Sequence, residues 1–133
     1  MRLSSLSIWN FRSIREAKEI RLEALQALVG ENNCGKSNIL RAINCFLSSG
    51  AGGMEPADFN DQSEPCRIEC EFTDLLDAER KKLRPYLLNG DRVVLRKDLQ
   101  MVNDRVRGKV IVKAEYHGYQ AEPIQLQYSL KKI

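Results

Sequence analysis

Residues 25–47 carry the sequence feature that most restricts how this chain can fold. The apolar run 25–29 is typical of a buried strand, and it stops at Gly30. After a short polar stretch, apolar residues recur at helical spacing from Ile39 to Leu47, until serines and glycines end the pattern. The segment therefore predicts a strand, a loop bounded by glycines and a helix, in that order.

The loop, residues 30–37, reads GENNCGKS and fits the pattern G-x-x-x-x-G-K-[ST] at every defined position. Gly30 and Gly35 would let backbone N–H groups converge on a polyphosphate, and the helix would aim its positive dipole end at the same group. Lys36 would place a positive charge on the β and γ phosphates, and Ser37 would offer its hydroxyl to Mg²⁺. The motif predicts a site for a nucleoside triphosphate with magnesium.

Composition restricts the setting of this loop. Of the 133 residues, 43% are hydrophobic and 29% are charged, as in an ordinary globular domain, and no apolar run approaches the ~20 residues of a membrane span. The first residues alternate polar and apolar, unlike a signal peptide. We expect one cytoplasmic lobe, residues 1–133, without membrane contact. The net charge of +3 permits contact with nucleic acid but does not argue for it.

The four cysteines lack a CxxC pair and have a single histidine to accompany them, so a zinc site is not expected. Cys66 and Cys70 would lie ~13 Å apart on one face of a strand, too far apart to share a metal ion. We interpret the cysteines as small, reduced core residues. His117 precedes Gly118 in a predicted turn and is interpreted as a solvated loop residue.

Alternation of polar and apolar residues predicts the remaining strands. They cover 2–10, 17–22, 66–72, 93–95, 110–116 and 124–130, the last three forming an antiparallel meander with turns at 103–104 and 117–118. A helix is predicted over 74–84, with Leu75, Leu76 and Leu83 inward and Pro85 ending or kinking it. Its charged run 79–82 is interpreted as an exposed face, with DNA contact as the alternative. Residues 49–65 predict a long loop, either mobile or facing the nucleotide.

Three segments carry a resemblance to a known family: LSIWNFRSI (6–14), LVGENNCGKSNILRAI (28–43) and CRIECEFTDL (66–75). Together they resemble the N-terminal ATPase region of the RecF, SMC and OLD class, and most of all the overcoming-lysogenization-defect (OLD) nucleases. Members of that family look like an ABC-type ATPase head joined to a C-terminal Toprim nuclease. The resemblance implies an α/β P-loop NTPase lobe of the ABC-ATPase type, with a strand-loop-helix phosphate site beside an antiparallel β section.

The resemblance also implies the identity of the ligands. The nucleotide would be ATP, and no N-K-x-D motif for guanine is present. Arg12 would approach the nucleotide from the neighbouring strand pair, and Asn38 would join the loop around the phosphates. The glutamine that helps Ser37 hold Mg²⁺ could be Gln62 or Gln127. The nucleotide-binding set is Arg12, Gly30, Asn32, Asn33, Cys34, Gly35, Lys36, Ser37 and Asn38.

The chain departs from the family because several motifs are absent. It has no apolar run followed by Asp-Glu (Walker B); the nearest candidate, 93–98, is broken by Arg96 and Lys97. Residues 47–50 read LSSG, which we interpret as a helix stop and not as an ABC signature, and no Toprim acidic cluster is present. We therefore expect a piece of a longer protein that hydrolyses ATP, contacts DNA and pairs as a homodimer around the nucleotide, whereas the piece alone would not hydrolyse ATP.

Two alternatives stay open. The longer protein could be a RecF-like or SMC-like DNA repair ATPase, with a DNA clamp or a coiled coil in place of the nuclease. The chain could instead be a nucleotide-binding module that never hydrolyses its ligand.

Overall fold

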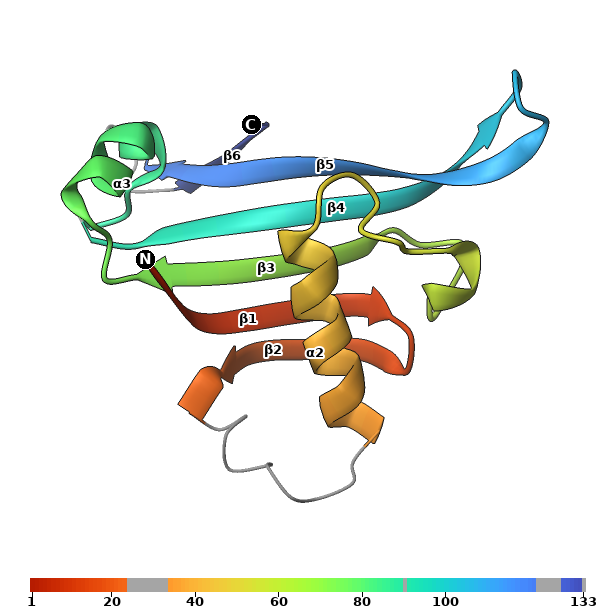
Figure 1. Cartoon of the computed structure of the whole chain (residues 1–133), viewed down its shortest axis with the longest axis horizontal. Coiled ribbons are helices and arrows are strands. Elements are labelled where there is room, and N and C mark those ends of the chain that lie inside the picture. Colours follow the sequence, from red (N-terminus) through yellow and green to blue (C-terminus); the bar gives the residue numbers. More distant parts are fainter. Residues whose placement is uncertain (24–33, 90, 122–127, 133) are drawn as a thin grey trace.

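The computed structural model describes residues 1–23, 34–89, 91–121 and 128–132. Within them, six strands form a single sheet in the order β2-β1-β3-β4-β5-β6, and every neighbouring pair is antiparallel (Figure 1). The strands are β1 (Arg2–Phe11), β2 (Ile14–Arg21), β3 (Cys66–Thr73), β4 (Val93–Asp104), β5 (Lys109–Ala121) and β6 (Tyr128–Lys132).

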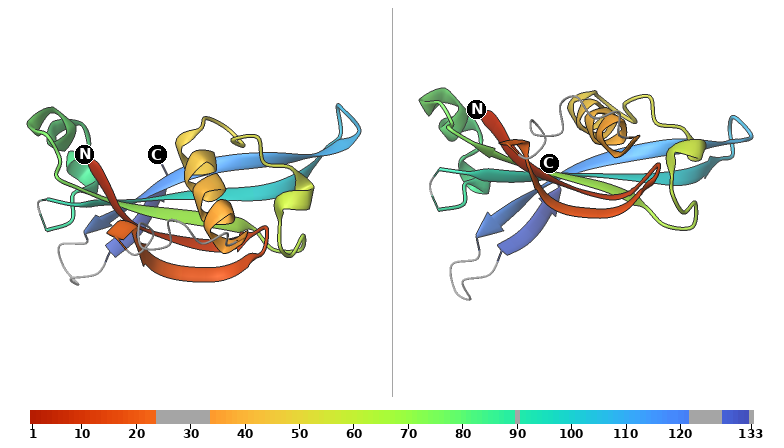
Figure 2. Two further views of the ribbon diagram at one scale, coloured as in Figure 1. Left: turned by 60° about the horizontal axis from the view of Figure 1, so that its bottom comes forward. Right: turned by 90° about the horizontal axis from the view of Figure 1, so that it is seen from below.

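One long helix of the described residues, α2 (Cys34–Leu47), crosses a face of this sheet, and no described helix covers the opposite face (Figure 2). The shorter helices are η1 (Pro56–Asp58), α3 (Asp77–Lys82) and η2 (Arg84–Tyr86). None of the described helices is both long and apolar enough to cross a membrane. The expected α/β arrangement is thus seen in part, as a mainly antiparallel sheet with its helix, while the predicted strand at 25–29 lies outside the described residues.

The predicted pairing of the first two strands is confirmed. β1 and β2 form a hairpin in which Phe11 lies opposite Ile14, and β1 pairs on its other side with β3. In β3, buried residues alternate with half-buried ones, as the sequence pattern predicts. Its buried face is directed toward α2, so β3 lies under the helix and supplies much of the core.

The cysteines are core residues, as predicted. Cys66 and Cys70 of β3 are free thiols with 0% and 1% of their surface exposed, and Cys45 of α2 is also buried. Burial disfavours the thiolate, so it raises the pKa of all three thiols, that of Cys70 to about 12. The side chain of Cys34 lies outside the described part.

The core lies between α2 and the sheet. Phe46 of α2 packs edge-on against Tyr116 of β5, with ring centroids 5.7 Å apart, and tilts against Phe72 of β3 at 6.2 Å. Aliphatic side chains of β1, β3 and β4 complete the cluster. Its buried residues are Leu6, Ile8, Phe11, Ala42, Cys45, Phe46, Met54, Phe59, Cys66, Ile68, Cys70, Phe72 and Leu99.

The loop over 49–65 is fastened to the sheet, and it contains the short helix η1. Met54 and Phe59 are buried in the core cluster. The side-chain amide of Asn10 donates hydrogen bonds to the carbonyls of Asp61 and Glu64, both at 2.8 Å. Apolar burial and a buried amide therefore hold the loop at both of its ends.

The helix predicted over 74–84 is shorter than expected. Asp74 has a positive φ of +54° and Leu76 is extended, so α3 begins only at Asp77. Leu75 is buried as predicted, but Leu76 is 66% exposed, which corrects its inward assignment. Glu79 accepts a hydrogen bond from the Leu76 N–H at 2.9 Å and fixes this start.

The turn predicted at 117–118 is wrong, because β5 continues through both residues. Gly118 lies opposite Leu95 in the last pair of the β4–β5 ladder, and it also pairs with Lys131 of β6. A Cβ atom at position 118 would lie 2.3 Å from Cδ1 of Tyr86 in η2. The glycine is therefore needed for the close approach of the Tyr86 ring to the strand and does not mark a turn.

Replacing Gly118 with alanine should destabilise the fold through this contact. We expect Gly118→Ala to lower the free energy of unfolding by about 1–3 kcal/mol, because the new methyl group overlaps the Tyr86 ring. In a Tyr86→Ala background the same change should be nearly neutral. Urea unfolding of the four proteins in this cycle measures the difference, and an equal loss of stability in both backgrounds would contradict the packing argument.

Candidate functional site

The first turn of α2 is the place where the phosphate-loop motif enters the described structure. The helix begins at Cys34, so Gly35 and Lys36 have helical backbone and the exposed Ser37 lies in the same turn. This turn carries no acidic side chain that would repel a phosphate. N–H groups at the start of a helix lack intrahelical partners and attract anions. The first loop positions, Gly30, Asn32 and Asn33 among them, lie outside the described residues.

Arg12, in the turn between β1 and β2, lies next to this helix. Its guanidinium Nη1 is 3.5 Å from the side-chain oxygen of Asn38, one residue after Ser37. The amide of Asn38 in turn donates a hydrogen bond to the hydroxyl of Ser13 at 2.6 Å. The β1–β2 turn and the first two turns of α2 are therefore connected through polar side chains.

The backbone of Arg12 is in the left-handed region, with φ of +52°, which costs energy for a residue with a side chain. Three contacts from the loop around η1 hold it there. The Arg12 N–H donates to the Asp58 carbonyl at 2.6 Å, and its Nε donates to the Asp58 carboxylate at 2.9 Å. The Asn60 side chain donates to the Arg12 carbonyl at 2.8 Å. Asp58 and Asn60 thus fix where the guanidinium points.

A hollow of about 240 Å³ opens between α2 and the loop that carries Asp58. Arg12 and Asp58 line one side, and Arg41 and Asn44 of α2 line another. Two arginines and one carboxylate line this space, so the charge of its lining is net positive. The α2 residues of this lining belong to the second half of the helix.

The opposite end of α2 is held by a buried lysine. Lys97 of β4 has 0% of its surface exposed, and its Nζ donates hydrogen bonds to the carbonyls of Cys45 at 2.7 Å and Ser48 at 2.8 Å. The hydroxyl of Tyr116 donates to the carbonyls of Phe46 and Ser48, and the lysine Nζ lies 5.0 Å from the centre of the Tyr116 ring. These two side chains cap the helix from the sheet.

A buried charge needs compensation, and here it comes from dipoles. The last carbonyls of a helix carry its negative dipole end and lack intrahelical donors. The Lys97 ammonium supplies hydrogen bonds to them, and the π face of Tyr116 adds a cation–π contact. Lys97 therefore fastens the phosphate-loop helix to the middle of the sheet.

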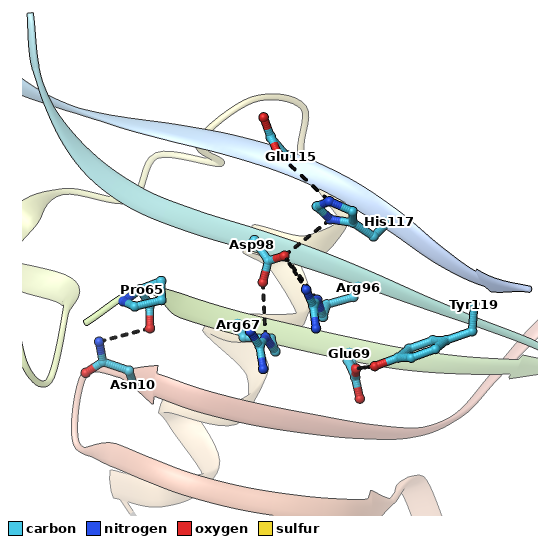
Figure 3. Close-up of polar contacts among 9 residues, drawn as sticks. All are labelled: Asn10, Pro65, Arg67, Glu69, Arg96, Asp98, Glu115, His117 and Tyr119. Carbon is cyan, nitrogen blue, oxygen red and sulfur yellow. Dashed lines mark hydrogen bonds and ion pairs between the residues drawn. The ribbon is translucent and has the colours of Figure 1, made fainter. Parts of the chain in front are cut away.

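The bare face of the sheet carries a network of charged side chains (Figure 3). Asp98 of β4 lies 3.1 Å from Arg67 Nε, 2.9 Å from Arg96 and 3.2 Å from His117 Nδ1. The side chain of His117 is 16% exposed, which corrects its interpretation as a solvated loop residue. On the same face, Glu69 of β3 accepts a hydrogen bond from the hydroxyl of Tyr119 in β5.

This network explains why residues 93–98 fail as a Walker B motif. Strand alternation places Lys97 on the face covered by α2 and places Arg96 and Asp98 on the other face. The Asp98 carboxylate forms ion pairs with two arginines on the side of the sheet away from the helix. Its carboxylate pairs charges within the sheet.

Of the residues expected to hold Mg²⁺, the structure describes Ser37 and Gln62. Ser37 is exposed and offers the hard oxygen that Mg²⁺ prefers, with phosphates and water completing its shell. Gln62 donates a hydrogen bond to the Pro56 carbonyl at 3.1 Å, and Gln127 lies outside the described residues. Among the described residues, no group of three or more His, Cys, Asp or Glu side chains could hold a metal ion.

The sequence did not reveal four residues that position Arg12 and α2. They are Asp58, Asn60, Lys97 and Tyr116. The alternation Val93, Leu95, Lys97, Leu99 does place Lys97 on the buried face, so a signal for it existed. Nothing local marks Asp58, because its partner Arg12 is 46 residues away.

Removing the ammonium of Lys97 should loosen the end of α2. We expect Lys97→Met to lower the free energy of unfolding by about 1–3 kcal/mol, because the Cys45 carbonyl loses this donor and the Ser48 carbonyl keeps only Tyr116. The exposed Lys109→Met is the matched control and should change stability by less than about 0.5 kcal/mol. Chemical denaturation followed by circular dichroism measures both, and equal stabilities would show that Lys97 is not the fastening residue.

Comparison with known proteins supplies the family. Residues 1–127 match the family described as AAA ATPase domain. The Old nuclease of Escherichia phage P2 is 34% identical over 98 residues, which cover 68% of this chain and 16% of the nuclease. An uncharacterized protein of Methanocaldococcus jannaschii is 42% identical over 50 residues, or 38% of this chain and 23% of that protein. The chain thus matches less than a quarter of either relative's length. It belongs to the AAA ATPase domain family and is an ATPase region of the OLD type.

Proposed function

We propose that this chain is the ATP- and Mg²⁺-binding lobe of an ABC-type ATPase head, and that the head belongs to a cytoplasmic, ATP-dependent DNA endonuclease of the OLD type. The observation that carries the proposal is the GENNCGKS motif running into the first turn of α2. The family match and the similarity to a protein named Old nuclease support the same interpretation.

In the phosphate loop, both backbone N–H groups and side chains would contact the nucleotide. The backbone around Gly30, Asn32, Asn33, Cys34 and Gly35 would surround the phosphates with N–H donors. Such a cradle binds the polyphosphate without needing a particular side chain at the variable positions.

The following residues would supply the charges and the metal ligand. Lys36 would neutralise the β and γ phosphates, and Ser37 would contribute its hydroxyl to Mg²⁺. Asn38 and Arg12, which the structure places in contact, would extend toward the phosphates from the side of the β1–β2 turn. Asp58 would hold Arg12 ready, so that less ordering is needed when the nucleotide binds.

Hydrolysis would need parts that this sequence lacks. A Walker B carboxylate and an ABC signature are both missing from the 133 residues. We propose that the longer protein supplies them, with the signature of one copy completing the site of a second copy. In this scheme the present lobe binds the nucleotide, and DNA is cut elsewhere in the assembly.

Calorimetric titration of the purified chain with a non-hydrolysable ATP analogue and Mg²⁺ tests the binding claim. We expect binding that is abolished in Lys36→Ala and weakened by about tenfold in Arg12→Ala, since a charge-assisted contact is worth about 1.5–3 kcal/mol. The exposed Lys82→Ala and Arg80→Ala are matched controls and should bind like the original chain. A GTP analogue should bind more weakly. Absence of binding by a folded chain, or full binding by Lys36→Ala, would contradict the proposal.

The nuclease claim needs the longer protein that carries this lobe. We expect that protein to cleave plasmid DNA with ATP and Mg²⁺, and we expect Lys36→Ala within it to abolish ATP hydrolysis and any ATP dependence of cleavage. Gel analysis of the DNA and phosphate release measure the two activities. ATP hydrolysis without any DNA cleavage would point instead to a RecF-like or SMC-like repair ATPase.

A further inference from the structure

The hairpin formed by β4 and β5 extends beyond the rest of the sheet (Figure 1). The pairing of β4 with β3 ends at Leu99, whereas β4 and β5 stay paired out to Asp104 and Lys109. We call residues 100–113 the β4–β5 arm. Its five paired positions per strand make a two-stranded ribbon roughly 16 Å long at the usual rise per residue.

The arm carries the net charge of the chain. Two arginines and two lysines, Arg105, Arg107, Lys109 and Lys113, oppose a single acid, Asp104, which gives the arm a net charge of +3. The whole chain also has a net charge of +3, so the remainder is balanced. All four cationic residues are exposed. Positive charge is therefore concentrated on one projecting element.

The turn of the arm is well fixed. The Asp104 carboxylate accepts hydrogen bonds from the N–H groups of Val106 at 3.0 Å and Arg107 at 3.3 Å. Gly108, with φ of +65°, donates its N–H to the Asp104 carbonyl at 2.8 Å. The one acid of the arm thus shapes the turn, and its contact with Arg107 Nε is a loose 3.6 Å. Within the described residues, Arg105, Lys109 and Lys113 have no acidic partner.

Val106 lies at the tip with 96% of its surface exposed. An apolar side chain at this position adds nothing to the core, and it is surrounded in sequence by Arg105 and Arg107. Some proteins bind DNA with strands placed in a groove, where cations contact the phosphates and apolar side chains can contact the bases. The major groove, about 12 Å wide, admits a two-stranded ribbon.

We propose that the β4–β5 arm is a contact surface for duplex DNA, with Arg105, Arg107 and Lys109 on the phosphates and Val106 directed into a groove. The choice of DNA as partner rests on the proposed function. The arm projects at one end of the sheet, away from the first turn of α2 (Figure 1). Its DNA contact is accordingly separable from ATP binding.

Fluorescence anisotropy of a short labelled duplex, titrated with the purified chain from about 50 to 200 mM salt, tests this inference. One variant combines Arg105→Ala, Arg107→Ala and Lys109→Ala, and leaves Asp104 and Gly108 in place. The matched control combines Arg80→Ala, Lys81→Ala and Lys82→Ala in α3, at the opposite end of the sheet (Figure 1). Both variants remove three exposed cations.

We expect the arm variant to bind DNA about tenfold or more weakly, with the slope of log affinity against log salt reduced by about one for each phosphate that is no longer neutralised. The α3 variant should stay within about twofold of the original chain. Equally weakened binding in both variants, unchanged binding by the arm variant, or no DNA binding by the original chain would overturn the inference. So would competition by a polyglutamate peptide as strong as that by DNA, which would indicate an acidic protein partner.

Titration of the arm variant with the ATP analogue separates the two proposals. Its nucleotide affinity should be unchanged. Weakened DNA binding with intact ATP binding supports the arm and leaves the proposed function standing. An original chain that binds DNA through the arm but binds no ATP analogue would contradict the proposed function alone.

Discussion

The bond on which the rest of this structure depends joins the Lys97 ammonium to the last carbonyls of α2. An antiparallel sheet offers a helix only side-chain packing, which leaves the helix free to slide. A buried ammonium directed at the carbonyls of Cys45 and Ser48 fixes the helix along its own axis. Because α2 is rigid and 14 residues long, fixing one end also sets the position of its first turn. This bond therefore determines where the phosphate-loop residues of α2 lie relative to the sheet.

The other end of α2 is positioned by a different kind of interaction. Arg12 reaches Asn38 from a strained backbone conformation that the loop around Asp58 maintains. That loop is itself fastened by Phe59 in the core and by the Asn10 amide. The long connection after α2 thus has a structural task, since it returns from one end of the helix to hold an arginine at the other. Strain at Arg12 is consistent with a position where geometry matters more than stability.

How much of this could be predicted from the sequence differs from element to element. Local patterns sufficed for α2 and for β3, whose alternation of cysteine, isoleucine and phenylalanine has one interpretation. They failed at Gly118, where a glycine is required because the Tyr86 ring of η2 packs against the strand, and not because the chain turns. The phosphate loop was recognisable because its chemistry depends on consecutive residues. The residues that support it, Asp58 and Lys97, act across 46 and 52 positions. Strand alternation places Lys97 on the buried face, but no local pattern identifies the partner of either residue.

The distribution of charge separates two parts of the same sheet. On its bare face, Arg67 and Arg96 share the Asp98 carboxylate, so these cations are neutralised where they stand. Beyond Leu99 the pattern changes, because the one carboxylate of the β4–β5 arm is used to build the turn. Cations that stabilised only the fold would be expected near acids, as they are over the sheet. Their concentration on a ribbon that projects beyond β3 leaves them open to a polyanion, and this is why the arm, and not the charged face, is the element expected to meet DNA.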